Sequence, residues 1–126
     1  MRNAVRGIIA LVGLFNLAIG FGFLLDPAGL GAKFFLTPVG IQGLATMRAD
    51  FTAFFVTGGA FALAGAWRGR AGPLGVPLLL LGIALSARCV SLFVDGIAPT
   101  AFGPMIVEAV MIALLLVGRR FLPLQR

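Results

Sequence analysis

The sequence contains no histidine and no tyrosine, and its only cysteine is Cys89. The absence of histidine removes the commonest acid–base group and the commonest metal ligand. A single cysteine excludes an intramolecular disulfide and a paired-thiol redox motif. No phosphate-binding loop or metal-ligand spacing is present, so the sequence predicts no catalytic residue, no metal site and no cofactor. We expect Cys89 to be a buried, unreactive thiol because it lies inside an apolar segment.

Charged residues are also scarce. They make up 11% of the 126 residues, whereas hydrophobic residues make up 60%, and the mean hydropathy is +1.10. A soluble domain has about a quarter charged residues, so this chain has too few to cover a surface that faces water. The formal charge of +6 comes from basic residues that flank apolar segments, a pattern that indicates membrane topology and argues against nucleic acid as a partner.

Four apolar segments are long enough to cross a bilayer, which takes about 20 residues. We predict helices over residues 4–25, 48–67, 74–94 and 104–120, in a single domain that covers residues 1–126. The predicted fold is an all-α, four-transmembrane-helix, up-down bundle. The first segment ends at Asp26-Pro27 without a convincing signal-peptidase site, so we expect it to be retained as a helix.

The connector at residues 28–46 is the longest segment outside these helices. It contains Lys33-Phe34-Phe35-Leu36, followed by Thr37-Pro38. This pattern predicts a short stretch on the membrane surface, with the Phe side chains dipped into lipid. An ordinary ordered loop fits the pattern equally well.

The basic residues predict the orientation of the bundle. With four spans, the N-terminus, the turn at residues 68–73 and the C-terminus share one side, which holds seven of the ten Lys and Arg residues. The positive-inside rule places that side in the cytoplasm. We therefore expect a multi-pass protein of a bacterial inner (cytoplasmic) membrane, with loops outside at residues 26–47 and 95–104. All four acids fall toward the outer half: Asp26, Asp50, Asp95 and Glu108.

Small residues form a stripe on each of the two middle helices. The stripes are Gly58, Ala62 and Gly65 on one helix, and Gly75, Gly82 and Ser86 on the next. Small residues let transmembrane helices approach closely. We therefore expect both stripes, and Gly58 and Gly82 in particular, to lie at helix–helix contacts.

Arg88 is the most informative charged residue. It lies about 10 Å inside the end of the third helix, where a charge requires a partner. Ser91 and Asp95 share its helix face. A loop of about ten residues makes the third and fourth helices antiparallel neighbours. We therefore predict a direct or one-water contact between Arg88 and Glu108, with Arg88 also bridging to Asp50. The predicted charged cluster is Arg48, Asp50, Arg88, Asp95 and Glu108, and Asn16, Thr57 and Ser91 could extend it.

Three interpretations of this cluster remain open. Paired charges can act as a structural clasp that fixes helix register. They can instead line a small polar cavity, open to the periplasm, that holds a ligand or relays protons. Finally, the charges can face the headgroups separately and never meet.

The spacing of these residues resembles a known family. The stretches that carry the resemblance are Arg48-Ala49-Asp50-Phe51, Gly58-Gly59, Arg88-x-x-Ser91-x-x-x-Asp95-Gly96, and Glu108. They are similar to a family of bacterial four-helix inner-membrane proteins known as a domain of unknown function (family number 4345). The resemblance implies a topology and no activity. The layout is more distantly similar to the DoxX-like proteins, a likeness of fold alone.

The function that best fits the sequence is a non-enzymatic subunit, surrounded by membrane lipid, that packs as a homo-oligomer or within a larger membrane complex. The alternative is a binding or transport module for a small polar or amphipathic ligand or for protons. A membrane enzyme ranks last, because catalysis would depend on Asp50, Arg88 and Glu108 alone.

Overall fold

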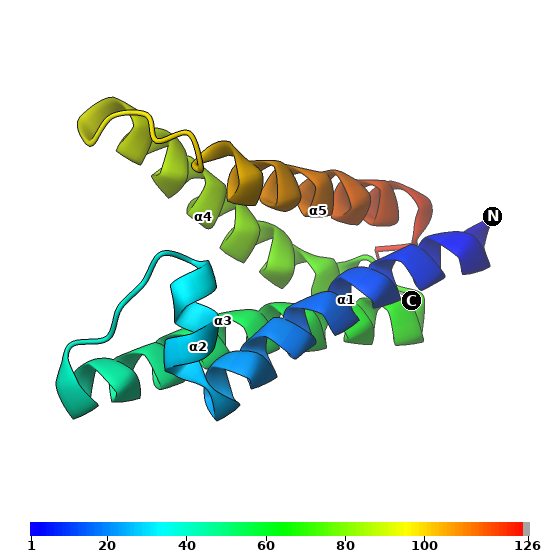
Figure 1. Ribbon diagram of the computed structural model, residues 1–126. Helices are drawn as coiled ribbons and strands as arrows, with labels where there is room; N and C mark the ends of the chain where they lie inside the picture. Colours follow the sequence, from blue (N-terminus) through cyan, green and yellow to red (C-terminus); the bar gives the residue numbers. More distant parts are fainter. Residues whose placement is uncertain (125–126) are drawn as a thin grey trace.

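The structure, a computed structural model, describes residues 1–124, and all regular secondary structure in this range is helical (Figure 1). Four segments are long and apolar enough to cross a membrane: α1, α3, α4 with the turn before it, and α5. The predicted all-helical fold with four apolar spans is therefore confirmed. The elements are α1 (Arg2–Leu25), α2 (Pro27–Lys33), α3 (Gly40–Arg68), the 3₁₀ turn η1 (Gly72–Leu74), α4 (Gly75–Val94) and α5 (Phe102–Phe121).

The largest difference from the predicted boundaries is at the start of α3. The helix begins at Gly40 instead of Arg48, and its first backbone hydrogen bond runs from the Gly43 N–H to the Val39 carbonyl at 3.0 Å. The first two turns contain Gly40, Gln42, Gly43 and Thr46, which lower their hydropathy. Hydropathy reports where lipid surrounds a chain, whereas a helix continues wherever its backbone bonds are unbroken. The extra turns were therefore missed.

The connector before α3 is partly helical. Asp26 ends α1, and its Oδ1 accepts a hydrogen bond from the Gly29 N–H at 2.9 Å, which caps α2 with Pro27 in its first turn. Phe34 and Phe35, which follow α2, lie in different surroundings. Phe35 is exposed, but the Phe34 ring packs on the buried ring of Phe23, with centroids 5.4 Å apart. The prediction that both rings dip into lipid is thus wrong for Phe34.

Helices α1 and α3 form the closest pair in the bundle and lie side by side in Figure 1. A Cβ atom added to Gly59 would lie 2.7 Å from the Gly13 carbonyl oxygen, and one added to Gly13 would lie 3.0 Å from the Gly59 oxygen. Further along the same interface, the Thr52 hydroxyl donates to the Gly20 carbonyl at 3.2 Å. The two backbones can approach this closely only because glycine occupies the crossing.

An arginine from each helix of this antiparallel pair binds the C-terminal end of the other. Arg6 of α1 donates through Nε to the Ala66 carbonyl at 2.7 Å and through Nη2 to the Trp67 carbonyl at 2.8 Å. Arg48 of α3 donates through Nε to the Leu24 carbonyl at 3.0 Å. The last carbonyls of a helix have no partner within it, and a positive charge there also interacts favourably with the helix dipole.

The small-residue stripe of α3 faces its neighbours as predicted, but the stripe of α4 does not. Gly58 is buried, and a Cβ atom there would lie 3.6 Å from Leu80. By contrast, nothing lies within 4 Å of a Cβ atom at Gly82, and Ser86 is exposed. The prediction for Gly82 is therefore wrong, because α4 turns Pro77 and Leu81 toward the bundle and presents Gly82 outward.

Cys89 shares this outward face, because it follows Gly82 by two helical turns. It is exposed, so the expectation of a buried thiol is also wrong. The apolar neighbours of Cys89 in the sequence belong to a helix with one face outside the bundle, and they do not bury the thiol inside the protein.

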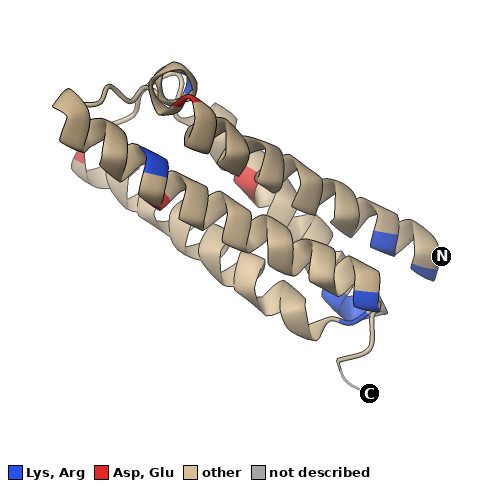
Figure 2. Ribbon diagram, turned by 90° about the horizontal axis from the view of Figure 1, so that it is seen from below, with Lys and Arg blue, Asp and Glu red and all other residues tan. Residues whose placement is uncertain are grey.

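Charge is distributed unequally along the bundle (Figure 2). The N-terminus, the turn between α3 and α4, and the end of α5 lie at one end, together with the arginines of those segments. The four acids lie toward the other end. Arg126, which the orientation argument also counted, lies outside the described residues. By their places in α1, α3, the turn after α3 and α5, the basic residues at the first end are Arg2, Arg6, Arg68, Arg70, Arg119 and Arg120.

Alanine substitutions at Gly59 and Gly82 should have opposite effects on stability. Gly59→Ala places a methyl group against backbone and should lower the free energy of unfolding by about 1–3 kcal/mol. Gly82→Ala meets open space and should leave it unchanged or raise it by up to about 1 kcal/mol, because alanine favours helix. Unfolding in detergent micelles by titration with dodecyl sulfate measures both. Equal losses in the two variants would contradict the close α1–α3 contact.

Candidate functional site: a charged cavity between α3, α4 and α5

An ion pair joins α4 and α5 inside the spans. Arg88 donates through Nε to Glu108 Oε1 at 2.9 Å, so the contact predicted from the sequence is present. The Arg88 side chain is 40% exposed and the Glu108 side chain 12% exposed. The pair forms because a short loop joins antiparallel helices, which brings the seventh residue of α5 to the depth of the last turns of α4.

The Glu108 carboxylate is only half satisfied. Oε1 accepts from Arg88, whereas Oε2 is buried and has no hydrogen-bond partner within residues 1–124. The whole residue is 9% exposed. Burying a polar atom without a partner costs about 1–3 kcal/mol, and more for a charged group. The site therefore has an acceptor that a hydrogen-bond donor would stabilise.

Glu108 lines a cavity of about 290 Å³, which we call the charged cavity. Helices α3 and α4 touch near Gly58 and Leu80 and diverge toward the start of α3 and the end of α4, as Figure 1 shows. The cavity lies where they diverge. Its wall is formed by α3, α4 and α5, together with the segment that follows α2. The lining residues are Phe34, Asp50, Phe51, Phe54, Phe55, Ala84, Arg88 and Glu108.

Aromatic rings form the apolar part of this wall. Phe51 stacks on Phe23 with ring centroids 4.7 Å apart, and Phe55 lies parallel to Phe23 at 6.0 Å. Phe54 meets the Phe55 ring edge-on at 5.1 Å. The buried Phe23 ring thus holds three of the wall residues in place: Phe34, Phe51 and Phe55. Positions 51, 54 and 55 share one helix face, so their spacing is the signal that could have predicted an aromatic wall.

Asp50 and Arg48 do not take the positions predicted for them. Asp50 lines the charged cavity, but within residues 1–124 its side chain makes no hydrogen bond or ion pair, so Arg88 does not bridge to it. Arg48 belongs to no part of the cavity, since its side chain binds the end of α1. The sequence placed both residues at the right end of the helix but could not show which neighbour each would face.

The remaining predicted residues lie outside the ion pair. Asn16 is buried, and its Nδ2 donates to the Val12 carbonyl at 2.9 Å and to Met111 Sδ at 3.3 Å. It therefore links α1 to α5 and does not touch Arg88 or Glu108 through a hydrogen bond. The other three are exposed and make no side-chain hydrogen bond in the described part of the chain: Thr57, Ser91 and Asp95.

Two residues outside the predicted cluster also make polar contacts between helices. Arg6 is one of the basic residues that the sequence analysis used only for topology, and Thr52 was not singled out. Both use their side chains to bind backbone carbonyls of the partner helix in the α1–α3 pair. No spacing rule within one helix identifies such contacts, because the acceptor is a main-chain oxygen that every residue carries.

The chemistry of the charged cavity suits binding. Within residues 1–124, no group of three His, Cys, Asp or Glu side chains is arranged to hold a metal ion. The cavity instead combines aromatic faces with one arginine and two carboxylates. Such a mixture of apolar surface and a few convergent polar groups is typical of small-molecule sites.

Comparisons with known proteins leave this site without a named counterpart. No protein-family model matches the sequence, no curated protein matches it, and no solved structure matches the fold. The resemblance to the family of unknown function therefore stays a prediction, and the geometry of the charged cavity carries the functional argument.

Removing one member of the ion pair should harm the protein more than removing both. Arg88→Leu leaves Glu108 buried without any partner, and Glu108→Leu leaves Arg88 unpaired. Each should cost about 3 kcal/mol, the lower end of the range for buried pairs, because Arg88 is partly exposed. The double variant should regain part of that loss. Titration with dodecyl sulfate measures the free energy of unfolding of the wild-type protein, the two single variants and the double variant. Additive losses in the double variant would show that the charges do not interact.

Proposed function

We propose that this protein is a non-enzymatic, multi-pass membrane protein that binds a small amphipathic molecule in the charged cavity. The observation that carries the proposal is Glu108 Oε2, a buried carboxylate oxygen with no partner among the described residues. A structural clasp alone would be better served by a carboxylate with both oxygens paired, because the unpaired oxygen lowers stability. A ligand that donates a hydrogen bond to Oε2 removes this cost.

The geometry favours one class of ligand. The molecule needs a donor group, an amine or a hydroxyl, for Glu108 Oε2. It also needs a compact apolar part for the aromatic wall formed by Phe51, Phe54 and Phe55. An amine fits better than an alcohol, because the two carboxylates outnumber the single arginine and aromatic faces attract cations. The volume of about 290 Å³ sets a small size, at the lower limit for ligand pockets.

We further propose that the termini face the cytoplasm of a bacterial inner membrane. The support is the set of arginines at the end of the bundle that contains the N-terminus and the turn between α3 and α4. The positive-inside rule assigns such an end to the cytoplasmic side. In this orientation the charged cavity lies in the periplasmic half, where it can receive a molecule from the periplasm or the outer leaflet.

Octylamine should stabilise the purified protein in detergent more than octane does. A ligand that binds only the folded protein raises its unfolding temperature. At a free ligand concentration of 100 times Kd, the free energy of unfolding increases by about 2.7 kcal/mol. Ala84→Leu fills the charged cavity without removing a charge and should abolish the shift. Ala109→Leu, next to Glu108 on an exposed position of α5, is the matched control and should keep it. Thermal unfolding in the presence of each additive is the measurement.

Two results would refute the proposal. The first is an equal shift with octylamine and octane in the wild-type protein, which would indicate partition into the micelle. The second is an undiminished octylamine shift in Ala84→Leu, which would place the amine elsewhere on the protein.

A second candidate function is packing with another copy of the chain through the outward face of α4. This helix is the least buried of the four spans, since only 11% of its apolar stretch is buried. Its outward face has a shallow, uncharged groove at Gly82 and Ser86, flanked by Leu79, Ile83 and Val90. Small residues that no other helix of the described chain covers suit close packing against a second helix in lipid.

Cys89 reports on this packing, because it lies on the same face of α4. Copper phenanthroline with oxygen should join two copies in native membranes by oxidising both Cys89 thiols to one disulfide. Gly82→Leu should prevent the product by separating the helices, whereas Ala113→Leu on an exposed position of α5 should not. Gel mobility without reductant detects the dimer. A monomer band alone in the wild-type lanes would exclude contact at this face.

A further inference from the structure

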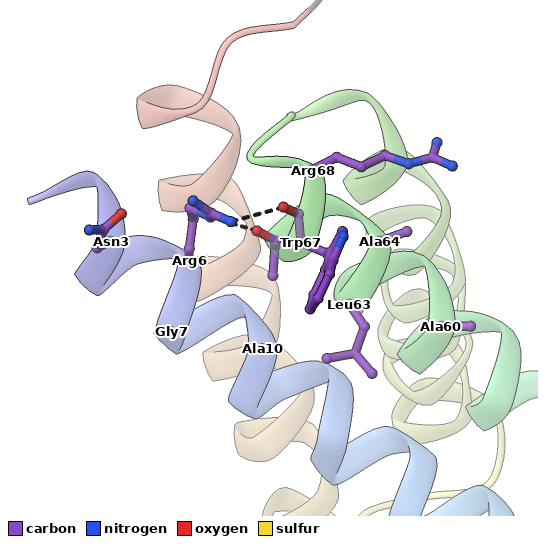
Figure 3. A pocket seen from close by; sticks show the side chains of 10 residues that line it. Asn3, Arg6, Gly7, Ala10, Ala60, Leu63, Ala64, Trp67 and Arg68 are labelled. Atoms are coloured by element: carbon purple, nitrogen blue, oxygen red, sulfur yellow. Dashed lines mark hydrogen bonds between the residues drawn. The ribbon is translucent and has the colours of Figure 1, made fainter.

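A groove lies at the opposite end of the bundle from the charged cavity, between the start of α1 and the end of α3 (Figure 3). Its volume is about 860 Å³. Asn3, Arg6, Trp67 and Arg68 surround its mouth, which lies at the end of the bundle where the arginines gather. The proposed ligand of the charged cavity does not involve this groove.

Arg6 is fixed at the mouth of the groove. Its Nε and Nη2 bind the carbonyls of Ala66 and Trp67, as the dashed lines in Figure 3 show. These two bonds hold the guanidinium in one orientation and leave other N–H groups without an acceptor among residues 1–124. A guanidinium held in this way is prepared to bind an anionic oxygen with little loss of side-chain freedom.

The groove continues from this charged mouth into the span as a strip of small residues. Gly7 and Ala10 come from α1, and Ala60 and Ala64 come from α3. Ala60 precedes Arg68 by about 12 Å of helix at 1.5 Å per residue. Leu63 also lines the groove (Figure 3), and the small residues beside it leave room for a flexible hydrocarbon chain that runs parallel to the helices.

The electrostatics of the mouth select an anion. The described arginines at this end include Arg2, Arg6, Arg68 and Arg70, while all four acids of the sequence lie in the other half of the bundle. Trp67 is 85% exposed at the same level. Its indole N–H suits the polar headgroup region, where tryptophan concentrates in membrane proteins.

We propose that this groove binds an anionic phospholipid, with the phosphate at Arg6 and Trp67, the charge of Arg68 adding to the attraction, and an acyl chain along the strip of small residues. A second copy of the chain fits poorly, because docking it here would bring like charges together. A soluble anion would leave the apolar strip unused. Basic sites between transmembrane helices are known to suit anionic headgroups.

Trp67 provides the measurement, because it is the only tryptophan and the chain has no tyrosine. Bromine atoms on an acyl chain quench tryptophan fluorescence only at close contact. We would reconstitute the protein in vesicles of phosphatidylcholine that contain increasing fractions of brominated phosphatidylglycerol. In a parallel series, brominated phosphatidylcholine would be added in place of brominated phosphatidylglycerol. The wild-type protein should favour phosphatidylglycerol by about five-fold or more, as expected for one arginine at an anionic site.

A pair of charge-matched variants separates the groove from general attraction. Arg6→Gln with Arg68→Gln should remove the preference. Arg119→Gln with Arg120→Gln removes the same charge from the same end of the bundle, but neither residue lines the groove, so the preference should remain. Ala60→Leu fills the strip, keeps every charge, and should reduce quenching by phosphatidylglycerol at least two-fold. It keeps the test valid if the Arg6 variant fails to fold.

Several results would overturn the proposal. Equal quenching by the two brominated lipids would show that the mouth does not select an anion. Equal losses in the two double variants would show attraction to net charge alone. Unchanged quenching in Ala60→Leu would exclude an acyl chain from the groove, and abolition of the preference by inorganic phosphate would indicate a site for the free anion instead.

Discussion

The contact between the backbones of α1 and α3 determines how the rest of the molecule is arranged. Glycines at the crossing let the two helices touch, and an arginine from each helix binds the last carbonyls of the other. The last carbonyls of a helix have no partner within it, so these side chains supply the donors that the two helix ends lack. Helices α1 and α3 are thus tightly packed, and α4 and α5 form a hairpin that packs more loosely against them.

The looser hairpin creates the charged cavity. Where α4 meets α3 closely, near Gly58, and where η1 meets α3 at Gly65, apolar side chains fill the contact. Where the two helices diverge, the Phe side chains of α3 and the Arg88–Glu108 pair face one another across open volume. Phe23 supports the aromatic wall from α1. The fold thus combines a rigid half and an open half, and the polar chemistry lies in the open half, where a ligand can be admitted.

Residue patterns within single helices predicted the spans and the Arg88–Glu108 contact, because a long apolar run and a short loop each leave few arrangements. These patterns did not predict which neighbouring helix, if any, a given side chain would face. Gly82 and Gly58 look alike in sequence, yet one faces outward and the other packs on α4. Arg48 and Asp50 are two residues apart and therefore point to different helices. Which face of a transmembrane helix meets protein depends on tertiary packing, since lipid and protein interior are equally apolar.

The helices differ in length, and this has a consequence for the surrounding bilayer. Helices α4 and α5 have 20 residues each, about 30 Å, which matches the hydrocarbon core. Helix α3 has 29 residues, about 43 Å, so in such a bilayer its first two turns would extend beyond the hydrocarbon core. A thicker bilayer would place residues 40–47, with their glycines and polar side chains, in hydrocarbon, whereas α4 and α5 would be too short to span it. A change in bilayer thickness therefore affects α3 differently from α4 and α5, which form the two walls of the charged cavity.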